Sequence, residues 1–135
     1  MSLIETCIAI LIVAVLTTMA IPSLLQSRDN YLLQSAAADV ATQMHQARVR
    51  AISRNTDCRL RVTTSVSYAV ECQEPVWAVV QSVVLPKGFT ISANARPEFH
   101  RLGNVAPAAT VTLTNSAGRS RKVVVNTAGR IRLEN

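Results

Sequence analysis

The stretch Met1–Ile21, MSLIETCIAILIVAVLTTMAI, decides how this chain is organised. It contains one charged side chain, Glu5, and otherwise consists of apolar and small hydroxyl residues. A helix of this length reaches about 30 Å, which is the thickness of the hydrocarbon core of a bilayer. The first basic residue is Arg28, so the segment lacks the positively charged start of a secretory signal peptide. The stretch therefore predicts a membrane-spanning helix.

The single carboxylate needs an explanation, because a charge at membrane depth is costly and marks a function by default. The segment resembles the N-terminus of mature type IV pilins and pseudopilins. Glu5 and Pro22 occupy the two hallmark positions of that family, and Ser2-Leu3-Ile4-Glu5 is similar to its usual Thr-Leu-Ile-Glu. Met1 stands where Phe is commonest. The alternative is a generic signal-anchor that carries a stray Glu.

The pilin resemblance implies a sequence of processing and assembly steps. A prepilin peptidase removes a short leader, and the new N-terminal amine, here that of Met1, is methylated. The helix is inserted in the bacterial inner membrane with the C-terminal domain in the periplasm, and it then assembles with other pilin subunits. Glu5 is expected to neutralise the amine of a neighbouring subunit, because pairing two buried charges offsets their desolvation. Met1, Glu5 and Pro22 are thus the predicted assembly residues.

The same helix is predicted to continue past Pro22 to about Asn55. Beyond Arg28 apolar residues recur at spacings of three and four, which is one face of a helix; they are Leu33, Ala36, Val40, Met44, Ala47 and Ala51. We therefore expect three parts: an apolar helix segment over residues 1–27, an amphipathic half of the same helix over 28–55, and an antiparallel β domain over 56–135. The expected fold class is α+β, with the helix packed on the sheet.

Charge is distributed unevenly along the 135 residues. The net charge is +6, and because Glu5 is the only charged residue before Arg28, the remainder carries 14 basic and seven acidic residues, a net charge of +7. A strongly basic domain favours an acidic partner such as nucleic acid or an anionic surface. The plain alternative is that the charge serves solubility alone.

Two cysteines lie in a predicted β-hairpin. Apolar residues alternate over Cys58–Val62 and again over Tyr68–Cys72, and pairing these strands through Thr64-Ser65-Val66 places Cys58 opposite Cys72. Opposed cysteines are close enough to bridge, and an exported domain permits oxidation. We therefore predict a Cys58–Cys72 disulfide, with two reduced buried thiols as the alternative.

Further strands are predicted downstream. The β-rich run Val76–Leu85 ends at a Pro-Lys-Gly turn and is followed by an alternating strand over Phe89–Ala93. Residues 94–107 are predicted to form a loop with a short strand around Phe99. Trp77 and Phe89 are predicted to be core residues.

The C-terminal part contains two turns that are near-copies of each other. Strands are predicted over 110–113, 121–125 and 130–133, joined by turns at Asn115–Gly118 and Asn126–Gly129. Each turn leads into a Gly-Arg-x-Arg sequence. Alternate residues of a strand face the same side, so each arginine pair shares a side, and Ile131 and Leu133 are expected to face the core. The predicted basic ridge consists of Arg119, Arg121, Lys122, Gly129, Arg130 and Arg132.

This C-terminal region resembles the GspH/FimT group of pilin-like proteins, whose closing pattern is similar to Val-Asn-Thr-Ala-Gly-Arg-Ile-Arg-Leu at 125–133. The group includes the minor pseudopilin of type II secretion and minor pilins, some of which bind DNA during natural transformation through a Gly-Arg-x-Arg motif. Gly129-Arg130-Ile131-Arg132 matches that motif. Arginine forks fit phosphate oxygens, and aromatic residues are few, so we expect binding without sequence preference.

Enzymatic function is not expected. The sequence shows no nucleophile–base arrangement, no phosphate-cradling Gly loop and no paired carboxylates. His45 and His100 have no metal-ligand spacing around them, so neither a metal nor a cofactor is expected. The predicted function is that of a minor type IV pilin that binds DNA for uptake. The alternative is a minor pseudopilin of type II secretion, or a structural pilus subunit, without DNA binding.

Overall fold

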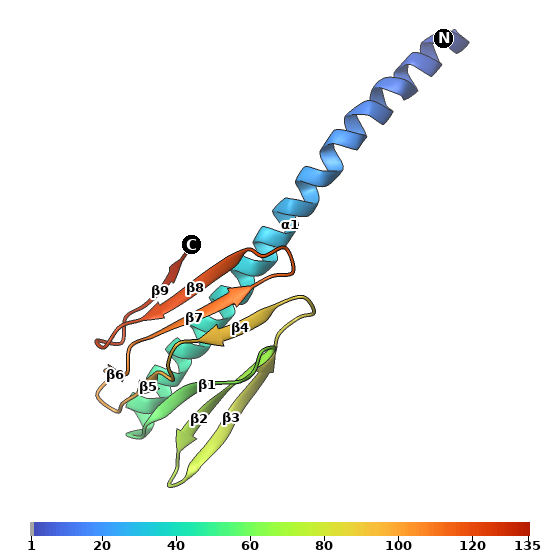
Figure 1. Cartoon of the computed structure of the whole chain (residues 1–135). Coiled ribbons are helices and arrows are strands. Elements are labelled where there is room, and N and C mark those ends of the chain that lie inside the picture. The colour runs from blue at the N-terminus through green and yellow to red at the C-terminus, as the bar shows by residue number, and fades with distance from the viewer. Residues whose placement is uncertain (1) are drawn as a thin grey trace. The chain divides into compact units, whose positions relative to one another are not determined.

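The computed structural model describes residues 2–135; Met1, the predicted methylated terminus, lies outside the described residues. One helix, α1 (Leu3–Arg54), continues through Pro22 without a break (Figure 1). This confirms the predicted single helix to within one residue at its end. The chain forms two compact units that divide inside this helix, between Leu32 and Leu33.

The first unit is the N-terminal half of α1. Its side chains are exposed throughout, from Leu3 (83%) to Leu25 (54%). The helix is long and apolar enough to cross a membrane, by length and composition. Water is a poor solvent for such a surface, so a bilayer or neighbouring helices must cover it.

The second unit begins where α1 becomes buried. The predicted stripe is confirmed, and two further alanines join it; the buried residues are Leu33, Ala36, Ala37, Val40, Ala41, Met44, Ala47 and Ala51. Small side chains on this face allow the sheets to approach the helix closely. Asn55 directly follows the helix, and its φ of 53° is the left-handed conformation that asparagine tolerates at a helix C-terminus.

Two antiparallel sheets cover this half of the helix. The five-stranded sheet has the order β3-β2-β1-β5-β6, and its strands are β1 (Cys58–Thr64), β2 (Ser67–Gln73), β3 (Trp77–Val84), β5 (Glu98–Phe99) and β6 (Val105–Ala106). The four-stranded sheet has the order β4-β7-β8-β9, and its strands are β4 (Thr90–Ala93), β7 (Ala109–Thr114), β8 (Ser120–Val125) and β9 (Ile131–Glu134). β6 lies in the segment predicted to be loop. The predicted α+β fold class is confirmed.

The β1–β2 hairpin has the predicted register. Cys58 lies opposite Cys72, and the two form a disulfide with a Cα–Cα distance of 4.1 Å. Tyr68, from the same face, is 1% exposed. Burial, together with the nearby charge of Asp39 on α1, raises the pKa of Tyr68 to about 12, so its hydroxyl stays protonated at neutral pH.

Trp77 corrects the prediction that both Trp77 and Phe89 belong to the core. Phe89 is 8% exposed and does, whereas Trp77 pairs with Gln73 on the face of the sheet that points away from α1. There the guanidinium of Arg59 lies over the Trp77 ring, 4.1 Å from the ring centroid. β3 is an edge strand, and its side chains point alternately toward α1 and away from it. Trp77 is at one of the positions that point away.

Backbone hydrogen bonds join the two sheets at two places. The Ile91 amide on β4 donates to the Ser65 carbonyl in the β1–β2 turn at 2.7 Å. The Val105 amide on β6 donates to the Thr127 carbonyl in the β8–β9 turn at 2.9 Å. The second of these bonds brings the turn that carries the predicted DNA-binding motif against the other sheet.

Candidate nucleic-acid interface and assembly residues

The two near-copy turns have the same local structure. In the first, the Gly118 amide donates to the Asn115 carbonyl at 3.1 Å, and the Arg119 amide donates to the Asn115 Oδ1 at 3.0 Å. In the second, the Gly129 amide donates to the Asn126 carbonyl at 2.9 Å, and the Arg130 amide donates to the Asn126 Oδ1 at 2.8 Å. Asparagine side chains commonly hold turns in this way.

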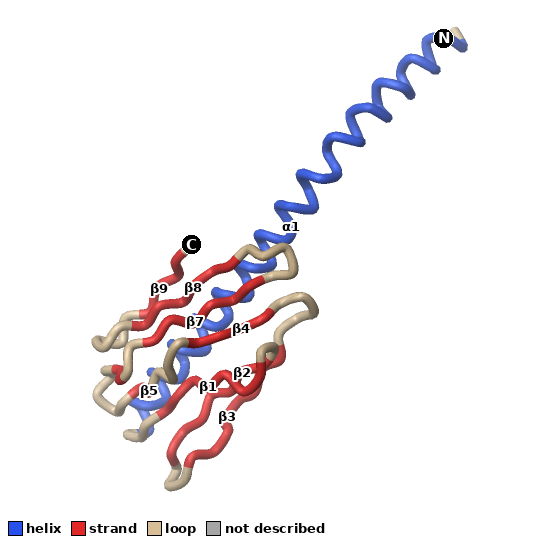
Figure 2. The backbone as a smooth tube through the Cα atoms, in the orientation of Figure 1, coloured by secondary structure: helices blue, strands red, loops and turns tan. Residues whose placement is uncertain are grey.

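The turns lie at opposite ends of β8, as Figures 1 and 2 show. A strand of six residues separates them by about 20 Å at about 3.3 Å per residue. The predicted single ridge of arginines is therefore wrong. An antiparallel strand has a turn at each end, so consecutive hairpin turns of one meander cannot be neighbours.

The arginine pairs that follow the two turns also lie on opposite faces of the sheet. Arg121 pairs with Leu113, which is fully buried, so the first motif is in register with the core-facing residues. Arg132 pairs with Val124, and Val124 pairs with Thr110, a row on the outer face. Along β8, Asn126 is seven positions after Arg119. Because side chains alternate between the two faces, an odd number of steps places Arg119 and Asn126 on opposite faces of the sheet. This count was available in the sequence and is the signal that our sequence analysis missed.

Three basic residues, from β8, from β9 and from the position just before β9, share the outer face of the sheet. Lys122, Arg130 and Arg132 are all exposed, and they lie on the face of the four-stranded sheet that points away from α1. We call these three residues the outer basic face. Glu134 lies opposite Lys122, and its carboxylate is 3.9 Å from the Arg132 guanidinium. Both side chains of that pair are about half exposed or more, so water and salt weaken it.

Gly129 lies at a close packing contact that was not predicted from the sequence. Its φ is +81°, and a Cβ there would collide with the Gly103 carbonyl oxygen and lie 2.8 Å from the Arg48 Nε. Arg48 of α1 donates from Nε to that same Gly103 carbonyl at 2.9 Å. The helix, the loop before β6 and the β8–β9 turn thus meet at one point, where only glycine fits.

Leu133 is more exposed than the prediction of a core-facing residue implies. It pairs with Val123, which is fully buried, and so lies on the predicted core side. Even so, Leu133 is 49% exposed. β9 is the last strand of the sheet, so no neighbouring strand covers its outer edge. Ile131, one row closer to the turn, is partly buried against the core as predicted.

The assembly residues lie in the first half of α1. The Glu5 Oε2 accepts a hydrogen bond of 3.4 Å from the Ser2 amide, and the Glu5 amide donates to the Ser2 carbonyl at 3.1 Å. The bond from the Ser2 amide to the Glu5 carboxylate is the carboxylate half of a capping box at the start of the helix. The Glu5 carboxylate therefore has a hydrogen-bond partner inside its own chain. Pro22 lies within the continuous helix.

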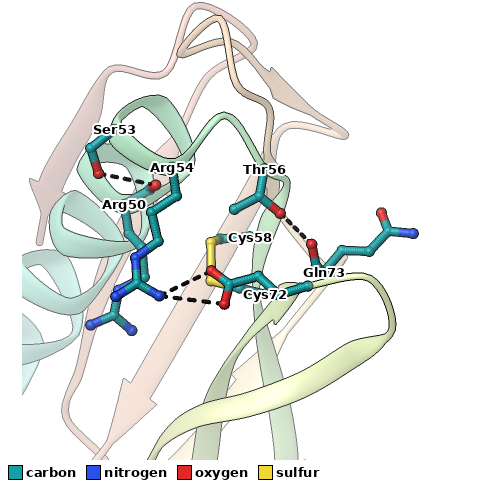
Figure 3. A network of polar contacts seen from close by, with 8 residues as sticks. Arg50, Ser53, Arg54, Thr56, Cys58, Cys72 and Gln73 are labelled. Atoms are coloured by element: carbon teal, nitrogen blue, oxygen red, sulfur yellow. Dashed lines mark hydrogen bonds and ion pairs between the residues drawn. A yellow bond between two sulfur atoms is a disulfide. The ribbon is translucent and has the colours of Figure 1, made fainter.

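Polar contacts fasten the end of α1 to the end of the β1–β2 hairpin (Figure 3). Arg54 pairs with Glu74 at 3.0 Å, and the Thr56 hydroxyl donates to the Gln73 carbonyl. The disulfide lies next to these contacts. The backbone around Cys58 is therefore held by an ion pair, a hydrogen bond and a disulfide.

The chain matches the family model of the type II transport protein GspH over residues 36–129. This chain belongs to the GspH family. The match spans the five-stranded sheet, β4, β7, β8 and most of the buried half of α1, and it includes both turns, whereas β9 follows its end. No curated protein matches the chain. As a GspH-family protein with a long apolar first helix, it is a pilin-like minor pilin or pseudopilin.

Solved structures confirm the fold of this GspH-family protein. The type IV minor pilin FimU of Pseudomonas aeruginosa is 19% identical with a TM-score of 0.65, and the match covers 79% of this chain and 91% of FimU. The minor pseudopilin EpsH of the Vibrio cholerae type II secretion system is 13% identical with a TM-score of 0.66, covering 76% and 95%. GspH of Escherichia coli is 12% identical with a TM-score of 0.65, covering 78% and 89%. At these identities the likeness shows the fold alone.

Proposed function

We propose that this GspH-family protein is anchored in the inner membrane, with its β domain in the periplasm, and is then built into a pilus or its tip. The fully exposed apolar half of α1 supports both states, since lipid or neighbouring helices can cover it. The disulfide is consistent with an oxidising compartment. We further propose prepilin peptidase processing, methylation of Met1, pairing of that amine with Glu5 of a neighbouring subunit, and a structural rather than catalytic role.

We propose in addition that the protein binds DNA through the outer basic face, in support of DNA uptake. The observation that carries this proposal is that Lys122, Arg130 and Arg132 are exposed on one face of the four-stranded sheet. Arg119 and Arg121 are left out, because they are in the opposite phase to Lys122 along the chain. The site is therefore smaller than the six residues expected from the sequence.

Such a face suits a phosphate backbone, whose charge does not depend on the base sequence. Guanidinium forks and an ammonium group bind phosphate oxygens regardless of sequence. The nearest aromatic residue to the second turn in the sequence is Phe99, and it is fully buried. Binding by three cations should give a slope of log K against log salt of about −2.7 for duplex DNA.

The test measures binding of the full chain in neutral detergent micelles to a fluorescent duplex of about 20 base pairs. Fluorescence anisotropy is followed over a series of salt concentrations. The triple variant Lys122→Gln, Arg130→Gln, Arg132→Gln should lose at least tenfold in affinity at low salt and most of the salt slope. Glu134→Gln should bind more tightly, because it removes the carboxylate beside Lys122 and Arg132.

The matched control is the double variant Arg119→Gln, Arg121→Gln, which removes the other copy of the motif. It should stay within about twofold of the wild type, since cations on another face add only a long-range, screened attraction. Wild type that fails to bind at low salt, or a control that loses as much affinity as the triple variant, would overturn the proposal.

A second candidate function is that of a type II secretion pseudopilin without DNA binding. The observation that favours it is Gly129, whose place in the Gly-Arg-x-Arg motif is explained by packing against Gly103 and Arg48 alone. The family model and the EpsH likeness also fit this reading. Absence of DNA binding in the test above would leave this function as the proposal.

A further inference from the structure

Three potential metal ligands converge at the edge of the five-stranded sheet where β1 meets β5. In the β1–β5 register Cys58 lies opposite Phe99 and Arg59 lies opposite Glu98, so Asp57 falls opposite His100. Glu98 and His100 are two residues apart and face the same side of the chain. A carboxylate oxygen of each acid and a ring nitrogen of His100 all lie within 4.8 Å of one another.

We propose that Asp57, Glu98 and His100 bind a divalent transition-metal ion, with Zn²⁺ as the best fit. Two carboxylates and one imidazole form a mixed oxygen and nitrogen donor set, which suits Zn²⁺ better than the all-oxygen preference of Mg²⁺ or Ca²⁺. Two carboxylates carry two negative charges, which the ion would neutralise. No sequence motif predicts this site, because Asp57 lies more than 40 residues from the other two ligands.

The distances leave little rearrangement to be made. In a tetrahedral zinc site with bonds of about 2.0 Å, neighbouring ligand atoms are about 3.3 Å apart. The His100 Nδ1 and the Asp57 Oδ1 are already 3.3 Å apart. The carboxylate oxygen of Glu98 lies within 4.8 Å of the other two ligand atoms. To reach a spacing of about 3.3 Å it has to move by at most about 1.5 Å. Glu98 is half-buried on a flexible side chain and can make that movement by rotating its χ angles.

The neighbouring cation does not occupy the site. Arg59 lies opposite Glu98 in the ladder, but its guanidinium is 2.6 Å from the Glu71 carboxylate and rests on the Trp77 ring. Within residues 2–135, Glu98 takes part in no ion pair. A half-buried carboxylate beside a second one, without a cation of its own, is a site that a metal ion would stabilise.

The ligand backbone is fixed on both sides. Asp57 precedes the disulfide cysteine Cys58, and its carbonyl accepts a hydrogen bond from the Gln73 amide at 2.9 Å. The Asp57 Oδ1 also accepts from the Arg101 amide at 3.3 Å, and the His100 amide donates to the Asn104 carbonyl at 2.9 Å. Ligands held in this way lose little entropy on binding an ion.

An open cavity of about 580 Å³ adjoins the cluster and includes Asp57, His100 and Asn104 in its lining. It would admit the ion and would leave the fourth coordination position to a water molecule or to a group from another molecule. A site with three protein ligands and one open position is typical of zinc that binds exogenous ligands.

The test uses the full chain in detergent micelles, stripped with a chelator and titrated with Zn²⁺ alone and with Co²⁺ alone. We expect one ion per chain, a visible Co²⁺ d–d absorption band, and a rise of several degrees in the thermal midpoint. Glu98→Gln and His100→Gln should each weaken binding by at least tenfold. His45→Gln is the matched control and should bind as the wild type does, because His45 lies exposed on α1.

Nuclear magnetic resonance of the wild type supplies a readout that needs no variant. The imidazole resonances of His100 should shift on addition of Zn²⁺ and those of His45 should not. Three results would overturn the proposal: no binding at micromolar Zn²⁺, binding that persists in both Glu98→Gln and His100→Gln, or imidazole shifts confined to His45.

Discussion

The turns Asn115–Gly118 and Asn126–Gly129 are nearly identical in sequence and in hydrogen bonding, yet they serve different purposes. A Cβ at Gly118 would meet nothing within 4 Å among the described residues. A Cβ at Gly129 would collide with the Gly103 carbonyl. Asn115 is 9% exposed, whereas Asn126 is exposed to solvent. Local sequence therefore sets the shape of a turn, and the rest of the fold sets what the turn contacts.

The largest expected effect comes from replacing each glycine by alanine. Both positions have positive φ, which costs a non-glycine residue about 1 kcal/mol or more. Gly129→Ala adds a collision with backbone that cannot move freely, so its free energy of unfolding should fall by about 3 kcal/mol or more. Gly118→Ala should lose about 1 kcal/mol. Chemical denaturation of the full chain in detergent, followed by circular dichroism, measures both.

Asparagine separates the two contributions in the glycine variants. Because asparagine tolerates positive φ, Gly118→Asn should lose less stability than Gly118→Ala. Gly129→Asn should be as damaging as Gly129→Ala, since any Cβ collides there. Equal losses at positions 118 and 129 would show that the Gly103 contact has no energetic weight.

The next effect concerns Arg48, which reaches the second turn, whereas nothing in residues 2–135 lies within 4 Å of a Cβ placed at Gly118 in the first. Arg48→Ala removes the hydrogen bond to the Gly103 carbonyl and should lower the free energy of unfolding by about 2 kcal/mol. Arg50→Ala, on the same helix, is the control and should change it by less than about 0.5 kcal/mol. Thermal unfolding of both variants gives the comparison.

A double-mutant cycle sharpens this result. The Cβ of Gly129→Ala would also press on the Arg48 Nε at 2.8 Å. Arg48→Ala combined with Gly129→Ala should therefore lose less stability than the sum of the two single changes. Strict additivity would mean that Arg48 and Gly129 do not share one packing site.

The smallest effect concerns the asparagines that hold the turns. Asn115 accepts from the Ala117 and Arg119 amides in a buried setting, so Asn115→Ala should cost about 1.5 kcal/mol. Asn126 is exposed and water can replace its oxygen, so Asn126→Ala should cost about 0.5 kcal/mol. Urea denaturation measures both losses. A larger loss of stability at Asn126 than at Asn115 would contradict the prediction that the buried asparagine matters more.

The candidate sites divide in the same way as the turns. The residues of the outer basic face could be chosen from the sequence, and their separation from Arg119 and Arg121 could be counted from the strand phase. The cluster of Asp57, Glu98 and His100 could not, because it depends on β5 pairing with β1, a strand that is distant in the sequence. Pairings of strands distant in sequence leave no local pattern.

The sequence alone determined the continuous α1, its buried stripe, the register of the β1–β2 hairpin and the disulfide. Each follows from periodicity or turn chemistry within a span of about 20 residues. Only the tertiary structure decided that Gly129 packs on Gly103, that β9 is an edge strand with Leu133 exposed, and which side chains surround His100. Those outcomes depend on the order of strands and on where α1 lies beneath them, which long-range packing sets.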